Sequence, residues 1–198
     1  KYAGGDTDDD YNVNYNFMVA SDGSLSYDHE YTGGFNEGLT TGPGVVVMNE
    51  WQHISVTRDT TLKEYKMYVN GKLVSTSTYV NNPVGGSLGP LFTSGSTQDE
   101  YSEFSLWDKV LTPQEIQHVM HSHLLGNEAG LVGYWPFNEG IGNSATDHSS
   151  NSKNGTITDT VWNNNAPIIY GTNIYTTDTI SSSEQLVLEH TITAPTYS

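Results

Sequence analysis

The chain has 198 residues, of which 7 are basic and 23 acidic, so its formal net charge at pH 7 is −16. A surface of this sign repels phosphate groups, which excludes nucleic-acid binding and disfavours anionic lipid. No window approaches 18 consecutive apolar residues, so we expect no membrane insertion. The chain has no cysteine, so its fold must be held by its core, by calcium or by neighbouring subunits.

Short alternating runs separated by polar turns fill the first half of the chain and predict antiparallel strands. The expected elements are strands over 16–20, 24–31, 45–48 and 51–58, with a loop over 33–44. The strongest signal lies over 65–74, where Asn70-Gly71 separates two alternating runs. This pair predicts a two-residue hairpin turn with positive φ at both positions.

The second half predicts one helix among further strands. Thr112 and Glu115 form a capping box, Pro113 suits the first turn, and Gly126 is placed to end the helix. A lone helix in a β-protein is expected to pack against the edge or rim of a sandwich. The expected strands are 88–93, 100–107, 131–137 and 155–158, with another over 184–193 in a Thr/Ser-rich tail.

Three segments together resemble the LamG-like jelly-roll family of the concanavalin A-like lectin/glucanase superfamily. They are Glu50 to Val74, with EWQHISVTRD and YKMYVNGKLV, Phe104 to Ile116, FSLWDKVLTPQEI, and Gly130 to Gly155, which opens with GLVGYWPFNEG. Pentraxins share the passage from strand to helix in the second segment. The resemblance covers about residues 10–165 and implies an all-β fold, an antiparallel β-sandwich (jelly roll) with one short α-helix.

We expect a jelly-roll domain over 1–168 and a Thr/Ser-rich tail over 169–198, either a linker or the start of a further domain. Members of the family usually open with a strand pair that this chain lacks. Three explanations remain open: the first strands lie outside the sequence, the fold is permuted so that 131–158 supplies them, or a neighbouring chain donates them.

An acidic loop near the beginning of the chain is a candidate calcium site. Asp6, Asp8, Asp10 and Asn12 place oxygen ligands at alternate positions, and Ca²⁺ prefers six to eight such oxygens. The loop is not an EF-hand, because Tyr11 replaces the required Gly. A weaker candidate is Gln98 to Glu100, whereas Asp147 to Asn151 is interpreted as a hydrogen-bonded Asx turn.

The sequence carries no convincing catalytic set, so we expect a protein that is not an enzyme. Gly85 to Gly89 matches the letters of a hydrolase nucleophile elbow, but Pro90 and a β-pattern follow where a helix is required. On a continuous strand, Asp99 and Glu103 would lie about 13 Å apart, beyond the separation that glycoside hydrolysis uses. The histidines of the predicted helix lack the i, i+4 spacing of zinc sites and are interpreted as surface or capping residues.

Aromatic and acidic residues before the strand at Phe104 indicate a binding surface. Tyr101, Asp99 and Glu103 share one face of the predicted strand, and sugars stack on aromatic rings while carboxylates accept their hydroxyl protons. We therefore expect a secreted, extracellular binding or cell-adhesion module for a glycan (carbohydrate) or surface protein, with calcium. The alternatives are a structural subunit of a cell-surface assembly and, second, a glycoside hydrolase of the same superfold.

Overall fold

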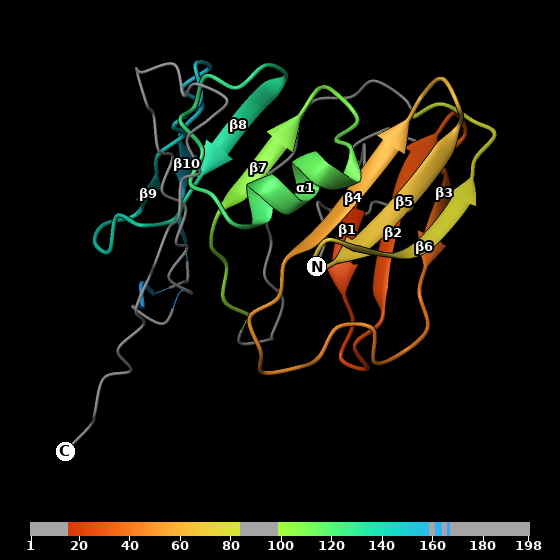
Figure 1. Cartoon of the computed structure of the whole chain (residues 1–198), viewed down its shortest axis with the longest axis horizontal. Helices are drawn as coiled ribbons and strands as arrows, with labels where there is room; N and C mark the ends of the chain where they lie inside the picture. The colour runs from red at the N-terminus through yellow and green to blue at the C-terminus, as the bar shows by residue number, and fades with distance from the viewer. Residues whose placement is uncertain (1–15, 84–98, 159–160, 164–165, 167–198) are drawn as a thin grey trace, which may run out of the picture.

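The computed structural model describes residues 16–83, 99–158, 161–163 and 166, and in these residues strands form antiparallel sheets with one helix lying over them (Figure 1). The first sheet has the order β1-β2-β3 and the second β4-β5-β6. Two further pairs are β7-β8 and β9-β10. The all-β sandwich with one short helix is therefore confirmed.

The first sheet is built from two successive hairpins. β1 (Asn16–Val19) pairs with β2 (Leu25–Tyr31) across the predicted turn, in which Gly23 has φ 77°. β2 then pairs with β3 (Phe35–Thr40), a segment for which a loop was expected. That expectation is wrong because β3 is an exposed strand with few apolar residues, so periodicity gives it little signal. The strand expected over 45–48 is also wrong, since Val46 is buried from a loop.

The second sheet confirms the predicted hairpin. β4 (Ile54–Asp59) pairs with β5 (Glu64–Val69), which in turn pairs with β6 (Lys72–Thr78). Asn70 and Gly71 join β5 to β6 with φ values of 49° and 69°. Both are positive, as the two-residue turn requires.

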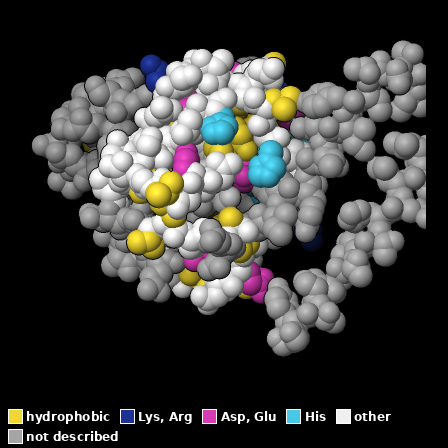
Figure 2. All heavy atoms as spheres, turned by 90° about the vertical axis from the view of Figure 1, so that its left-hand side faces the viewer, with side chains coloured by type: hydrophobic (Ala, Val, Ile, Leu, Met, Phe, Trp, Pro, Cys, Tyr) yellow, Lys and Arg dark blue, Asp and Glu magenta, His cyan; other side chains and the backbone are white. Residues whose placement is uncertain are grey.

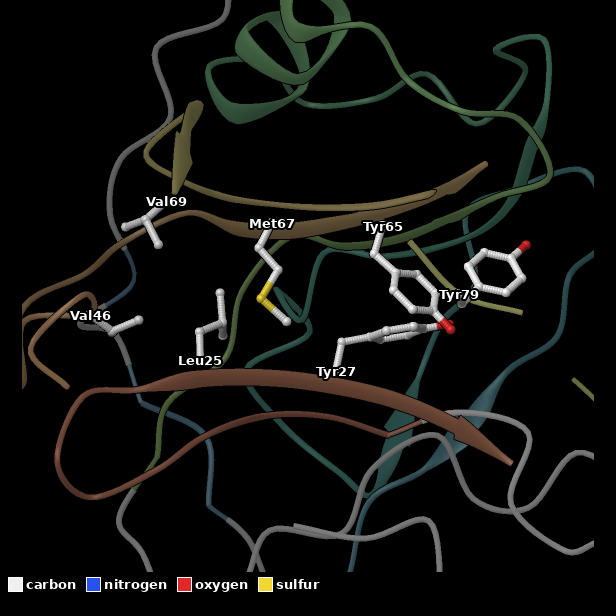
Figure 3. Packing of buried hydrophobic residues seen from close by; sticks show 7 residues of the cluster. All are labelled: Leu25, Tyr27, Val46, Tyr65, Met67, Val69 and Tyr79. Carbon is white, nitrogen blue, oxygen red and sulfur yellow. The ribbon is translucent and has the colours of Figure 1, made fainter. Parts of the chain in front are cut away.

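The core lies between β2 and β5, which face each other across the sandwich (Figure 3). Leu25 and Tyr27 extend from β2, and Tyr65 and Met67 from β5, and none is more than 6% exposed. The rings of Tyr27 and Tyr65 meet edge to face at 5.2 Å, and Tyr79 stacks on Tyr65 at 4.6 Å. Each such side chain contributes on the order of 2 kcal/mol by its burial, so this cluster holds the two sheets together.

A histidine is completely buried at one end of the core. The hydroxyl of Tyr65 and Nδ1 of His29 are hydrogen-bonded, while Nε2 of His29 lies 2.9 Å from the carbonyl oxygen of Asn81. Burial lowers the pKa of His29, because an imidazolium would lose its hydration there. The unfolded chain therefore takes up a proton first, so this histidine reduces stability as the pH falls below about 6.5.

The helix α1 (Pro113–Met120) begins as predicted but ends early. The side chain of Thr112 accepts a hydrogen bond from the N–H of Glu115, and the carboxylate of Glu115 accepts one from the N–H of Thr112. His121 is the C-cap, so Gly126 is not the helix stop that the sequence predicted. The helix lies over the second sheet, close enough that a Cβ on Gly71 would clash with the side chain of Gln117.

The remaining strands are shorter than expected. β7 (Phe104–Trp107) pairs with β8 (Leu131–Trp135), and β9 (Ser144–Ala145) pairs with β10 (Gly155–Thr156). The strands predicted over 88–93 and 184–193 and the tail over 169–198 lie outside the described residues. Within the described part of the chain, no helix has both the length and the apolar character needed to span a bilayer.

Candidate functional site

The backbone changes direction at Glu103, immediately before β7. Glu103 has φ 56°, a left-handed conformation that costs a non-glycine residue about 1 kcal/mol. Its N–H donates to the carbonyl oxygen of Pro136 over 3.3 Å. The strand predicted over 100–107 therefore begins only at Phe104, and strand alternation cannot be extended from Phe104 back to Asp99.

The carboxylate of Glu103 is held between two side chains from other elements. The hydroxyl of Tyr134, on β8, donates to Oε2 of Glu103. Nδ1 of His123 lies 3.0 Å from Oε1. The side chain of Glu103 is 16% exposed and that of His123 is 53% exposed, so the histidine forms the outer side of the group. We call Glu103, Tyr134 and His123 the β7–β8 polar cluster.

The loop after α1 fixes the position of His123. The carboxylate of Glu128 accepts hydrogen bonds from the N–H groups of Leu125 and Gly126, at 2.6 and 3.0 Å. Gly126 has φ 89°, and a Cβ at this position would lie 1.9 Å from the carbonyl oxygen of His148. The glycine therefore allows the loop to pack closely against the segment that contains His148.

Tyr134 is fixed from its backbone by a second carboxylate. Oδ1 of Asp147 accepts hydrogen bonds from the N–H groups of Tyr134 and Ser149, at 2.9 and 2.8 Å. Oδ2 accepts from the N–H of Lys153 at 2.7 Å and from the hydroxyl of Ser149 at 3.0 Å. The bond from Ser149 two residues on is the predicted Asx turn, which the structure confirms.

The protonation of these groups follows from their surroundings. Burial alone would raise the pKa of Asp147, but the donated hydrogen bonds outweigh it and the pKa is lowered. Burial raises the pKa of Tyr134, and the hydrogen bond to Glu103 adds to this effect. The phenol of Tyr134 is therefore a stable donor to Glu103 at neutral pH, and the ring of His148 meets it edge to face at 6.1 Å.

The other two predicted binding residues interact with each other. Tyr101 is 48% exposed. Burial raises the pKa of its phenol, and the charge of Asp99 and a hydrogen bond with it raise the pKa further. The structure thus joins Tyr101 to Asp99, whereas Glu103, two residues after Tyr101, is joined to Tyr134 and His123.

The face of the molecule that carries β9 and β10 presents mainly polar and acidic groups. Figure 2 shows histidine side chains on this face, with acidic side chains close by and hydrophobic side chains scattered over it. This mixture of ring systems and carboxylates suits hydrogen bonding to a polar ligand.

The predicted calcium ligands Asp6, Asp8, Asp10 and Asn12 lie outside the described residues, as does Gln98. Among the residues that the structure describes, no group of three or more His, Asp or Glu side chains is placed to hold a metal ion. The site at Asp6 to Asn12 stays a prediction.

Sequence reasoning missed two members of the polar cluster. Tyr134 lies in the segment GLVGYWPFNEG, which was used only to identify the family. His123 was placed on the predicted helix and interpreted as a surface or capping residue. The helix ends at Met120, so His123 belongs to the following loop. A His three residues before an Asx- or Gly-rich turn is too common to indicate such a contact by itself.

Comparisons with known proteins are consistent with this architecture. A family model described as the concanavalin A-like lectin/glucanases superfamily matches residues 2–117, more than half of the chain. No curated protein matches significantly.

Two solved structures are similar at low identity. One is a candidate carbohydrate-binding protein from Bacteroides ovatus, with 19% identity, a TM-score of 0.46, and coverage of 73% of this chain and 47% of that one. The other is an S-layer domain-containing protein from Clostridium thermocellum, with 20% identity, a TM-score of 0.29, and coverage of 54% and 55%. This chain therefore spans about half the length of the structures that it matches.

Proposed function

We propose that this chain, which belongs to the concanavalin A-like lectin/glucanase superfamily, is a non-catalytic saccharide-binding module. The observation that carries this proposal is the β7–β8 polar cluster, in which Glu103 is held between Tyr134 and a half-exposed His123. The binding site consists of this cluster together with Tyr101 and Asp99.

Each group has a distinct part in binding. The ring of Tyr101 offers an apolar face for the C–H groups of a sugar, and its hydrogen bond with Asp99 restricts the ring's orientation. The carboxylate of Glu103 accepts sugar hydroxyls, and the imidazole of His123 supplies a further polar group at the rim. Because Tyr134 holds Glu103 from the protein side, the carboxylate loses little conformational freedom when a ligand binds.

We prefer binding to hydrolysis because neighbouring carboxylates are committed to the backbone. Hydrolysis of a glycosidic bond needs two acids, about 5 to 9.5 Å apart, one of which exchanges protons with the substrate. Asp147 accepts four hydrogen bonds, and Glu128 accepts two from backbone N–H groups. Neither acid is therefore available to act with Glu103 as a catalytic pair.

The proposal includes the setting of the protein. An excess of acidic residues keeps such a module soluble in salt and favours divalent cations, so we place it outside the cell with a glycan or surface protein as its partner. Calcium bound by Asp6, Asp8, Asp10 and Asn12 would stabilise the beginning of the domain. A role as a subunit of a cell-surface assembly is the alternative, and light scattering after size exclusion separates a monomer from an assembly.

A glycan array, with and without a calcium chelator, tests the proposal. We expect one class of glycan to bind, and Tyr101→Ala to weaken that binding by about two- to tenfold, since stacking on an aromatic ring contributes about 0.5–1.5 kcal/mol. Phe35→Ala is the matched control, because Phe35 is a 62% exposed aromatic residue on β3. Absence of any bound glycan in both conditions, or equal losses in the two variants, contradicts the proposal.

A further inference from the structure

A groove of about 290 Å³ opens beside the N-terminal end of α1, away from the β7–β8 polar cluster at the other end of the helix. The outer face of the second sheet forms one side, through side chains of β4, β5 and β6. The segment from Val110 to Pro113, which leads into the helix, forms the other side. A hollow of this volume is large enough for a sugar unit.

The sheet side of the groove presents hydrogen-bonding groups that are close to one another. Nζ of Lys66 lies 2.5 Å from Oε2 of Glu64, and these side chains are 36% and 25% exposed. Tyr68 lines the groove beside this pair and is 3% exposed as a whole. Its phenol can both donate and accept a hydrogen bond, so it can act with Lys66 and Glu64 in binding a hydroxyl group of a ligand.

Apolar side chains flank these polar groups. Leu73 on β6 is 53% exposed, and Val110 before the helix is 43% exposed. Pro113 adds a rigid apolar surface at the first position of α1. Donors and acceptors between apolar walls match a saccharide, whose hydroxyls form the ring edge and whose C–H groups form its faces.

The charge of the groove selects among saccharides. Asp59 and Glu64 contribute two negative charges, and Lys66 contributes one positive charge that Glu64 already pairs. An additional carboxylate on the ligand would therefore meet a net negative surface, whereas a hydroxyl or an ammonium group would not.

We propose that this groove is a second saccharide site, one that binds neutral or amino sugars and rejects acidic ones. The hydroxyl of Tyr68 and the paired Lys66 and Glu64 bind the hydroxyl groups of the ligand, and Leu73 and Val110 contact its C–H groups. This site does not depend on Tyr101 or Glu103.

Titration of the ¹⁵N-labelled full chain with galactose, glucosamine and galacturonate, followed by NMR, tests the inference. We expect the amide signals of Thr57, Lys66 and Leu73 to shift with galactose and glucosamine but not with galacturonate. Tyr68→Phe, which keeps the ring, should weaken both sugars at least fivefold. Lys66→Gln provides a second variant on the exposed part of the groove, with the same expected loss.

Two variants separate this site from the β7–β8 polar cluster. Tyr101→Ala and Glu103→Gln should leave the shifts at Thr57 and Leu73 unchanged, even where they weaken binding on the glycan array. The inference is overturned if neither galactose nor glucosamine shifts these signals, if galacturonate shifts them equally, or if both Tyr68→Phe and Lys66→Gln keep the affinity of the unmodified chain.

Discussion

Tyr134 contacts two carboxylates that differ in almost every respect. Its N–H donates to Asp147, which is 4% exposed and also accepts hydrogen bonds from Ser149 and Lys153. Its hydroxyl donates to Glu103, which also contacts His123, and the side chain of His123 is 53% exposed. Asp147 is thus a buried acceptor for backbone N–H groups, whereas Glu103 is held by side chains near the surface.

This difference distinguishes a carboxylate that stabilises the fold from one that is able to bind a ligand. A buried carboxylate whose lone pairs are used by backbone donors and a serine hydroxyl fixes a loop and has little accepting capacity left for a ligand. A carboxylate with side-chain partners at the surface keeps accepting capacity, and its outer partner can move when a ligand arrives. Substitutions at Asp147, Glu103 and His123 test this division.

The largest effect is expected for Asp147→Ala. It leaves three backbone N–H groups without their acceptor, two of them buried, so we expect the free energy of unfolding to fall by about 3 kcal/mol. Urea denaturation followed by circular dichroism measures the change. Glu103→Ala is the comparison, with an expected loss of about 1 kcal/mol. Equal losses in the two variants would contradict the division.

A smaller effect, visible in its pH dependence, is expected for Asp147→Asn. Because the pKa of Asp147 is lowered on folding, its ionised form stabilises the fold above the unfolded pKa near 3.9. That contribution disappears as the pH falls through the folded value. The Tm difference between the unmodified chain and this variant should therefore be constant near neutral pH and shrink below about pH 4. A difference that stays constant down to pH 3 is the contrary result.

The smallest effect on stability is expected for His123→Ala. Exposed ion pairs contribute little, so the free energy of unfolding should change by less than about 0.5 kcal/mol. The affinity for a bound glycan should nevertheless fall several-fold, because the polar rim of the site is lost. Parallel thermal melts and binding titrations measure both quantities. A clear loss of stability would instead show that His123 stabilises the fold.

Local signals in the sequence were sufficient for the elements that depend on neighbouring residues. The turn at Asn70-Gly71 and the capping box of Thr112 and Glu115 need contacts over at most three positions, and both are present. The edge strand β3 has little apolar periodicity, so it was missed.

The contacts of Glu103 could not be predicted from the sequence, for a different reason. Its partner Tyr134 lies 31 positions away, and the two meet only because β7 pairs with β8. The left-handed backbone at Glu103 has no local signature either, since neither glycine nor asparagine marks it. Glu103 could therefore be named as a candidate from its acidic side chain, but its partners could not be predicted.

Isothermal titration of one glycan, taken from the array, against Glu103→Gln and Asp147→Asn side by side compares the roles of the two carboxylates in one assay. We expect Glu103→Gln to lose at least tenfold in affinity while its Tm stays within a few degrees of the unmodified chain. Asp147→Asn should show the reverse, a lowered Tm with nearly unchanged affinity at a temperature where it remains folded. Full affinity in Glu103→Gln would contradict the assignment of the binding site to the β7–β8 polar cluster.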